Sequence, residues 1–196
     1  MKLEEETQKL TFVCTFNRMR YKLTLLVVAI SALYVDAQSL KVMTYNIRLN
    51  IASDGVNAWP NRNQKVAEFI KKINPEVFGV QEALHDQMQD LATALTDYAY
   101  LGVGRDDGKE KGEYTAIFYK KNRLRVEKSS SFWLSETPDK PGSIGWDAAI
   151  TRMATWAELE DVQSKQKFLF VTTHFDHMGK QARLMSASTI AMWVKG

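Results

Sequence analysis

Apolar runs and amphipathic segments alternate along the first half of the chain. The runs at 40–45 and 76–80 are typical of buried strands, and each precedes a pattern of helical period, at 61–73 and 84–95. Asn61 has the residue type that caps the start of a helix, so we expect the first helix to begin there. These segments predict successive β-α-β-α units.

The second half of the chain is mainly a series of strands. Polar, glycine- and proline-containing loops separate them, and one helical pattern follows the last strand. A mixed sheet, or two, with helices on the outer faces is the architecture that this order predicts. The expected strands are 98–103, 114–119, 124–133, 151–159 and 167–173, the loops are 50–60, 104–112 and 135–146, and the last helix is 179–194.

The N-terminal region has the three parts of a secretory signal peptide. Residues 23–35 carry no charge and are too short to span a bilayer comfortably, 19–22 are basic, and small residues precede Ala37. We expect a signal peptide at 19–37, cleavage after Ala37, and a secreted or periplasmic product; a buried N-terminal helix is the alternative. Residues 1–18 are too acidic for the start of a signal peptide. We expect that they result from a start codon assigned too far upstream, an over-long start. Residues 38–196 then form the domain.

Composition excludes several kinds of site in residues 38–196. Without residues 1–37 the chain holds 21 Lys and Arg against 19 Asp and Glu, a net charge of +2. That charge is too weak to argue for non-specific binding to nucleic acid. The single cysteine is Cys14, so the domain has no disulfide, cysteine nucleophile or Cys–Zn site.

Three polar residues stand where predicted strands end: Asn46, Glu82 and His174. Ligands in α/β folds collect at the carboxyl ends of strands. Mg²⁺ takes one or two protein carboxylates together with waters and phosphate oxygens, so we expect Glu82 to be a metal ligand. Asn46 could ligate the metal or bond a phosphate oxygen. One alternative is that these residues only mark the ends of strands. Another is that Glu82 caps the N-terminus of the helix that follows it.

Further candidates lie on the later strands. His174 can donate to a phosphate oxygen or protonate a leaving group, and Asp176 and His177 are spaced so that one could orient the other. Arg152 and Tyr114 are candidate phosphate contacts. Each has a plain alternative, namely a structural imidazole for His177, a solvated edge arginine for Arg152 and a core aromatic for Tyr114.

A zinc site is a rival interpretation of residues 174–177. Their His-Phe-Asp-His sequence resembles half of the H-x-H-x-D-H signature of metallo-β-lactamase-like hydrolases. Thr172 stands where the first histidine of that signature would fall, and the chain has three histidines in all, too few for two zinc sites. The zinc interpretation is therefore the less favoured one.

Five ordered segments resemble successive blocks of the endonuclease/exonuclease/phosphatase superfamily, which has the DNase I-like fold. The resemblance extends from about residue 40 to 194 and is closest to secreted bacterial members. It implies a four-layer α/β sandwich, two mixed sheets face to face with helices outside, and hydrolysis of phosphate esters with Mg²⁺ or Mn²⁺. The five blocks are 42–48, 75–82, 112–119, 152–156 and 172–177.

The resemblance also implies a role for each candidate residue. Glu82 would ligate the metal with Asn46 beside it, and His174 would stabilise the phosphate in the transition state. The remaining candidates would line the phosphate site or belong to the same block as His174, and they are Tyr114, Arg152, Asp176 and His177.

One departure from the family pattern concerns water activation. Family members continue with a Gly-Asp-x-Asn block and a final Asp-His pair, whereas residues 178–196 contain no Asp or Glu. We expect a C-terminally truncated domain that is inactive alone. A non-enzymatic phosphate- or sugar-binding module and complementation by a second chain are the alternatives. Nucleic acid, sugar phosphate, inositol phosphate and lipid head groups all remain open as substrates, and no membrane span is expected after the signal is removed.

Overall fold

The computed structural model describes residues 39–195, so the predicted leader and the predicted over-long start lie outside the described residues. The described part contains seven strands, three α-helices and one 3-10 helix. In chain order the elements are β1 (Val42–Asn46), η1 (Ala52–Asn57), α2 (Trp59–Ile73), β2 (Val77–Ala83), α3 (His85–Ala94), β3 (Tyr98–Leu101), β4 (Tyr114–Lys120), β5 (Leu124–Trp133), β6 (Met153–Asp161), β7 (Lys167–Thr173) and α4 (Lys180–Lys195).

Four strands form sheet A, in the order β1-β2-β4-β3. Strands β1 and β2 are parallel, with Val42 opposite Val77 and Asn46 opposite Gln81, because helix α2 returns the chain to the same end of the sheet. Strand β4 is antiparallel to both β2 and β3. Sheet A is therefore mixed, and the carboxyl ends of β1 and β2 share one edge.

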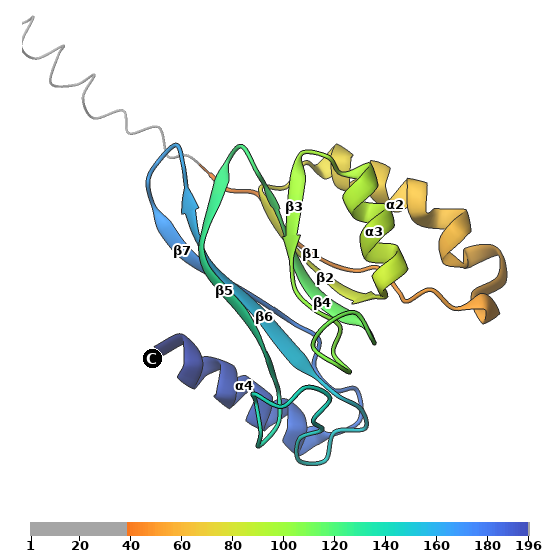
Figure 1. Ribbon diagram of the computed structural model, residues 1–196, viewed down its shortest axis with the longest axis vertical. Helices are drawn as coiled ribbons and strands as arrows, with labels where there is room; N and C mark the ends of the chain where they lie inside the picture. The colour runs from red at the N-terminus through yellow and green to blue at the C-terminus, as the bar shows by residue number, and fades with distance from the viewer. Residues whose placement is uncertain (1–38, 196) are drawn as a thin grey trace, which may run out of the picture. The chain divides into compact units, whose positions relative to one another are not determined.

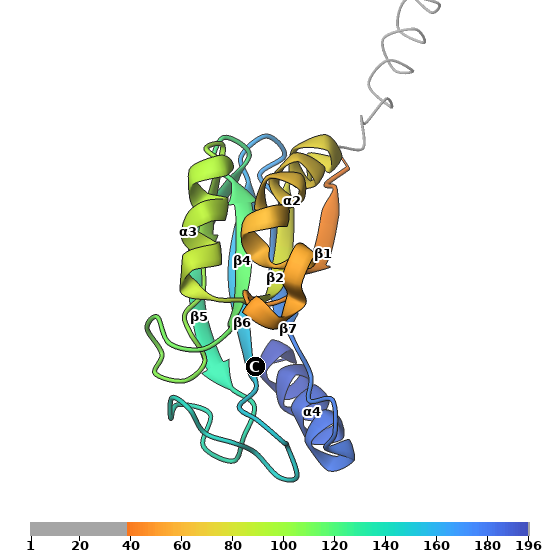
Figure 2. The same ribbon diagram turned by 90° about the vertical axis from the view of Figure 1, so that its right-hand side faces the viewer.

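Three antiparallel strands form sheet B, in the order β5-β6-β7. The layers in Figure 1 are, from right to left, α2 with α3, sheet A, sheet B and α4. Figure 2, turned by 90°, shows the strands of sheet A placed from left to right as β4, β2 and β1. The strands of sheet B are placed from left to right as β5, β6 and β7. The expected four-layer α/β sandwich is confirmed for the part of the chain that the structure describes.

Three apolar clusters hold these layers together, and the one between sheet B and α4 is formed by Phe132, Leu134 and Ala154. Under the helices, residues of α2 and α3 such as Ile70 and Leu91 pack on Phe78 and Phe118 of sheet A. Between the sheets, Val77 and Ile117 meet Ala157 and Leu159. The sheets approach each other closely at Gly79, where an added Cβ would lie 2.4 Å from Thr172 Oγ1.

The element boundaries differ from the sequence prediction at the first helix. Helix α2 begins at Trp59, so Asn61 lies inside the helix and does not cap it. Trp59 is buried, and Pro60 fits a first helical turn because the missing N–H has no intrahelical partner there. Among the helices of residues 39–195, none is both long enough and apolar enough to cross a membrane.

Candidate functional site

Glu82 lies at an irregularity in strand β2. The pairing with β4 shifts between Gln81 and Ala83, and Glu82 has a φ of 67°. Positive φ is uncommon for a residue with a side chain, and bulges of this kind re-aim a side chain near functional sites. The neighbouring Gln81 and Ala83 are buried, whereas Glu82 is only half-buried, so the bulge directs one carboxylate out of the sheet.

Asn46 and the loop after β1 hold the Glu82 carboxylate. Asn46 Nδ2 donates to Glu82 Oε1 at 2.7 Å, and the Leu49 N–H lies 3.4 Å from Oε2. The Asn46 side-chain oxygen accepts from the Arg48 N–H at 3.0 Å. The structure therefore brings these two predicted residues together, with Asn46 orienting Glu82.

His174 follows the last residue of β7 and reaches the same carboxylate. Its Nε2 lies 4.0 Å from Glu82 Oε1, and its Nδ1 is buried with no hydrogen-bond partner among the described residues. Burial and the nearby Arg152 cation lower the pKa of His174, and Glu82 only partly offsets them. The imidazole is therefore neutral at neutral pH.

Arg152 and Asp176 form a buried pair beside His174, and the exposed His177 contacts the pair from outside. Arg152 Nε contacts Asp176 Oδ2 at 3.3 Å, and the guanidinium Nη2 lies 3.1 Å from His177 Nδ1. The side chains of Arg152 and Asp176 are 4% and 1% exposed, so the ion pair is inside the protein. Arg152 is not the solvated edge arginine of the plain alternative.

Asp176 accepts hydrogen bonds from three backbone N–H groups and from Arg152. Burial by itself would raise its pKa, but backbone N–H groups of Gly179, Met178 and Ala149 and the side chain of Arg152 together hold the pKa well below its usual range. The Gly179 N–H donates to Oδ1 at 2.6 Å. A carboxylate committed in this way positions Arg152 and the turn into α4, and is poorly suited to accept a proton in a reaction.

Tyr114 lies beside the bulge but directs its hydroxyl elsewhere. It pairs with Ala83 across the strands, donates to the Lys109 carbonyl and lies 3.0 Å from His85 Nδ1. Burial raises its pKa to about 12, so it stays protonated. Its role as a phosphate contact remains a prediction, because both of its hydrogen-bond positions are used within the protein.

Several supporting residues were not found from the sequence. Arg105 pairs with Glu113 at 2.8 Å, and both act on the pKa of His174 from the loop before β4. Gln87 accepts from Asn50 N–H at 2.7 Å and donates to the Arg48 carbonyl, which anchors the loop after β1. Neither role has a signal in sequence spacing, because each joins segments that are far apart along the chain: the loop before β4 acts on His174, and Gln87 of α3 holds the loop after β1.

The residues of this site could supply only part of the ligands that a hard divalent cation needs. Residues 39–195 contain no group of three His, Cys, Asp or Glu side chains able to hold a metal ion. Glu82 supplies one carboxylate, which matches Mg²⁺ because that ion keeps several waters and takes substrate oxygens. The amide of Asn46 is turned toward Glu82 and Arg48, so its assignment as a second ligand stays a prediction.

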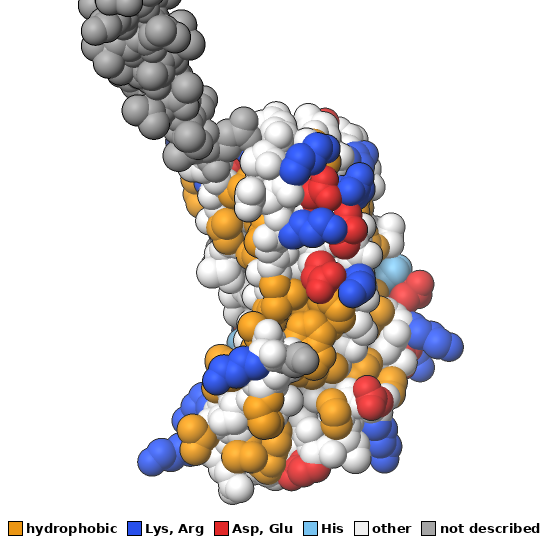
Figure 3. Space-filling model, turned by 90° about the vertical axis from the view of Figure 1, so that its left-hand side faces the viewer, with side chains coloured by type: hydrophobic (Ala, Val, Ile, Leu, Met, Phe, Trp, Pro, Cys, Tyr) orange, Lys and Arg blue, Asp and Glu red, His pale blue; other side chains and the backbone are white. Residues whose placement is uncertain are grey.

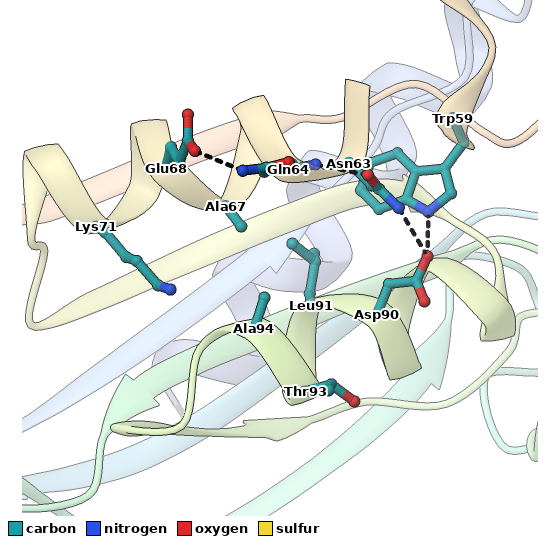
Figure 4. Close-up of a pocket in the computed structure, with 10 residues that line it drawn as sticks. All are labelled: Trp59, Asn63, Gln64, Ala67, Glu68, Lys71, Asp90, Leu91, Thr93 and Ala94. Carbon is teal, nitrogen blue, oxygen red and sulfur yellow. Dashed lines mark hydrogen bonds between the residues drawn. The ribbon is translucent and has the colours of Figure 1, made fainter. Parts of the chain in front are cut away.

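A separate cavity lies between helices α2 and α3. It has a volume of about 340 Å³, and Trp59 Nε1 donates to Asp90 Oδ2 at 2.7 Å across it. Figure 4 shows its lining residues, which come from these two helices alone. None of the predicted site residues lines it.

Comparison with known proteins identifies the family. A sequence profile of the Endonuclease/Exonuclease/phosphatase family matches residues 43–168. The chain therefore belongs to this family, and the resemblance drawn from the five blocks is confirmed.

Solved bacterial relatives have the same fold. The endonuclease/exonuclease/phosphatase of Bacteroides vulgatus is 45% identical, with a TM-score of 0.79 over 80% of this chain and 60% of that one. A mannosyl-6-phosphatase of Bacteroides thetaiotaomicron is 41% identical, with a TM-score of 0.78 over 80% and 59% of the two chains. An uncharacterized protein of Acanthamoeba polyphaga mimivirus is 26% identical over 76% of this chain and 27% of its own length. The chain thus spans about three fifths of the bacterial proteins it resembles, and less of the viral one.

Proposed function

We propose that this chain carries the metal- and phosphate-binding part of a divalent-metal-dependent phosphoesterase. The observation that carries the proposal is the Glu82 carboxylate, which a bulge turns out of the sheet, Asn46 orients and His174 approaches to 4.0 Å. Membership of a phosphoesterase family supports it. Magnesium or manganese is the ion we propose, since a single carboxylate with waters suits a hard cation.

Each residue has a task in this proposal. A bound metal would polarise the phosphoryl group or activate a water. Glu82 would hold the metal, and Asn46 would keep the carboxylate in place. Neutral His174 would donate a hydrogen bond to a phosphate oxygen from Nε2. Arg152, fixed by Asp176 and His177, would supply positive charge next to it.

A sugar phosphomonoester is the substrate class we propose first. The support is the mannosyl-6-phosphatase from Bacteroides thetaiotaomicron, which is 41% identical over most of this chain. A nucleic-acid substrate is less favoured, since the net charge of the full chain is only +3.

Metal binding tests the assignment of Glu82. We expect Mn²⁺, titrated by electron paramagnetic resonance in the presence of inorganic phosphate, to bind the full chain and to bind a Glu82→Ala variant at least about tenfold more weakly. Glu68→Ala is the matched control, because Glu68 is an exposed carboxylate on α2 that pairs with Gln64. Equal Mn²⁺ affinity in the two variants would refute the metal assignment.

Turnover separates an enzyme from the alternative of a binding module. Residues 178–196 contain no Asp or Glu, so this stretch supplies no carboxylate to activate water, and a hydrolysis assay is needed to distinguish the two. The chain should be assayed with Mg²⁺ on mannose 6-phosphate, bis-p-nitrophenyl phosphate and single-stranded DNA, with binding of mannose 6-phosphate followed by calorimetry. Hydrolysis that Glu82→Ala abolishes would show an enzyme; binding with no hydrolysis would support the module.

We also propose that the protein is secreted or periplasmic. The support is the basic, apolar and small-residue sequence of 19–37. N-terminal sequencing of the product from cells should find a chain that begins at Gln38. A product that begins at Met1 would contradict both the leader and the over-long start.

A further inference from the structure

The two faces of sheet B differ in their chemistry. On the outer face, hydrophobic side chains gather beside α4 and charged side chains gather beyond them, as Figure 3 shows. The charged side chains there form ion pairs between strands, such as Arg125 of β5 with Glu160 of β6 at 2.8 Å. The inner face packs on sheet A and carries two buried threonines, Thr155 of β6 and Thr172 of β7. A buried hydroxyl needs a hydrogen-bond partner, because leaving it unpaired is costly.

These two threonines have different partners. They stand opposite each other in the β6–β7 ladder, and they are 1% and 6% exposed. Thr155 Oγ1 lies 2.8 Å from Ser131 Oγ of β5, so this bond stays within sheet B. Thr172 Oγ1 accepts from Gln81 Nε2 at 3.0 Å, so this bond joins β7 to β2 of sheet A. The threonines are thus a matched pair, of which Thr172 carries the bond between the sheets.

The Gln81 amide connects three strands at once. Its Nε2 also donates to Thr44 Oγ1 of β1, at 3.2 Å. The side chain of Gln81 is buried and lies over Gly79, where an added Cβ would come within 3.2 Å of Nε2. An amide nitrogen carries two N–H groups, which provides one for each threonine. Through these bonds Gln81 joins β2 to β1 on one side and to β7 on the other.

The three strands that the amide joins are the strands that lead into the site. The bonded residue stands two positions before Asn46 on β1, directly before Glu82 on β2 and two positions before His174 on β7. Beyond the amide the distances are short, 2.7 Å from Asn46 Nδ2 to Glu82 Oε1 and 4.0 Å from His174 Nε2 to the same oxygen. A sideways shift of β1 or β7 against β2 would change these distances.

An apolar side chain would be easier to bury at this position than an amide. A buried amide gives up its bonds to water, and its bonds within the protein return little net stability. Elsewhere the sheets meet through apolar contacts, such as those of Val77 with Ala157. A hydrogen bond differs from these because it is directional and fixes both of its atoms. The pairing of β2 with β4 becomes irregular directly after Gln81, so this is where the strand ends need fixing.

We propose that Gln81 is a positioning residue whose amide fixes the ends of β1 and β7 against β2 and thereby sets the spacing between Glu82 and His174. The use of that spacing rests on the proposed function, in which a metal ion at Glu82 lies beside a phosphate held by His174. The proposal requires no contact of Gln81 with metal or substrate. Residues that orient metal ligands from behind affect metal affinity strongly even so.

Four variants separate positioning from a general loss of stability. Gln81→Met keeps the length of the side chain and removes both donors. Thr172→Val removes the acceptor on β7, whereas Thr172→Ser keeps the hydroxyl and should restore the behaviour of the unmodified chain. Thr155→Val is the matched control, because it removes a buried hydroxyl bond on the same face that does not involve Gln81.

The first measurement is made on the metal-free protein. The chain has three histidines, so ¹H–¹³C NMR of the imidazole groups gives one signal for each, and His174→Gln identifies the signal of His174. We expect Gln81→Met and Thr172→Val to displace this signal, and Thr155→Val and Thr172→Ser to leave it in place. A merely structural role would displace it as much in Thr155→Val as in Thr172→Val. Gln81→Met carries most weight, because it changes no residue of β7.

The second measurement is Mn²⁺ affinity in the presence of inorganic phosphate. Gln81→Met and Thr172→Val should each bind Mn²⁺ at least about tenfold more weakly than the unmodified chain, and Thr155→Val should bind it equally well. If the unmodified chain binds no Mn²⁺, the proposed function fails and the NMR comparison still decides the role of Gln81. An unmoved His174 signal in Gln81→Met would overturn the proposal. So would equal Mn²⁺ affinity of Gln81→Met and Thr155→Val in a chain that binds the ion.

Discussion

At the scale of single residues, the site depends on buried charges that hold one another. Arg152 and Asp176 are almost wholly buried and in contact, and Asp176 also accepts from three backbone N–H groups. Breaking such a pair leaves the remaining charge without a partner, which costs far more than the pair itself contributes. The sequence places these residues in two separate blocks, and their mutual contact follows from the meeting of the start of β6 with the turn after β7.

Replacing Asp176 with alanine should therefore destabilise the protein strongly. We expect Asp176→Ala to lower the free energy of unfolding by about 3 kcal/mol or more, because Arg152 stays buried without its counter-ion. Urea denaturation followed by circular dichroism measures the change. Asp139→Ala, which removes an exposed aspartate, is the control. If both variants lower the free energy of unfolding by a similarly small amount, the buried ion pair is not needed for stability.

The lowered pKa of His174 makes stability depend on pH. In the unfolded chain the imidazole takes a proton near its ordinary value of 6.5, whereas burial and Arg152 delay protonation in the folded protein. Stability contributed by this group is fully present above pH 6.5 and is lost as the pH falls through 6.5 toward the folded pKa.

We expect His174→Gln to lose less stability than the unmodified chain between pH 7.5 and pH 5, a window of about two and a half units around the ordinary histidine pKa. Urea titrations at several pH values measure this difference. Parallel pH profiles for the two proteins would show that His174 is as easily protonated in the fold as outside it.

At the scale of elements, two irregular features of β2 position the site. The bulge at Glu82 turns a carboxylate outward, and Gly79 lets β2 approach β7 so closely that a side chain would meet Thr172. Thr172 in turn accepts from Gln81 Nε2 at 3.0 Å. The end of β7, and with it His174, is thereby held against the end of β2.

Adding a methyl group at Gly79 should force the two sheets apart. We expect Gly79→Ala to destabilise the protein by about 1–3 kcal/mol through overpacking against Thr172. Thr172→Gly removes the two closest atoms, so the double variant should be more stable than the sum of the single effects predicts. Simple additivity in a urea double-mutant cycle would show that the sheets can separate here without cost.

At the scale of the whole described domain, residues of both sheets form one core. Val77 and Ile117 of sheet A share it with Leu124, Ala157 and Leu159 of sheet B. Because each sheet buries its inner face only on the other, the two should unfold together.

Truncating this shared core should weaken the whole domain. We expect Leu159→Ala to cost about 2–5 kcal/mol while unfolding stays a single transition. Tryptophan fluorescence and far-ultraviolet circular dichroism should give coincident curves. Leu184→Ala, at a 67% exposed position on α4, should change stability by less than about 0.5 kcal/mol. Two separate transitions would show that the sheets are independent.

Much of the fold could be predicted from local patterns. The bounds of β5 and β7 match the predicted strands residue for residue, and β2 and α3 differ by a few residues at their ends. The start of α2 was wrong, because burial of Trp59 outweighs the capping preference of Asn61. Asn46, Glu82 and His174 were predicted as site residues because ligands collect at strand ends, and the structure brings the three side chains together, while their roles stay a prediction.

By itself the sequence determined the order of strands and helices, the family, and which polar residues reach the end of a strand, because periodicity and motifs are local properties. Only the tertiary structure decided how those residues are used. It turned Glu82 outward at a bulge, set Asn46 to hold it, buried Arg152 with Asp176, and directed the Tyr114 hydroxyl to His85. Each of these outcomes depends on contacts between segments that are distant along the chain, and no local pattern encodes such contacts.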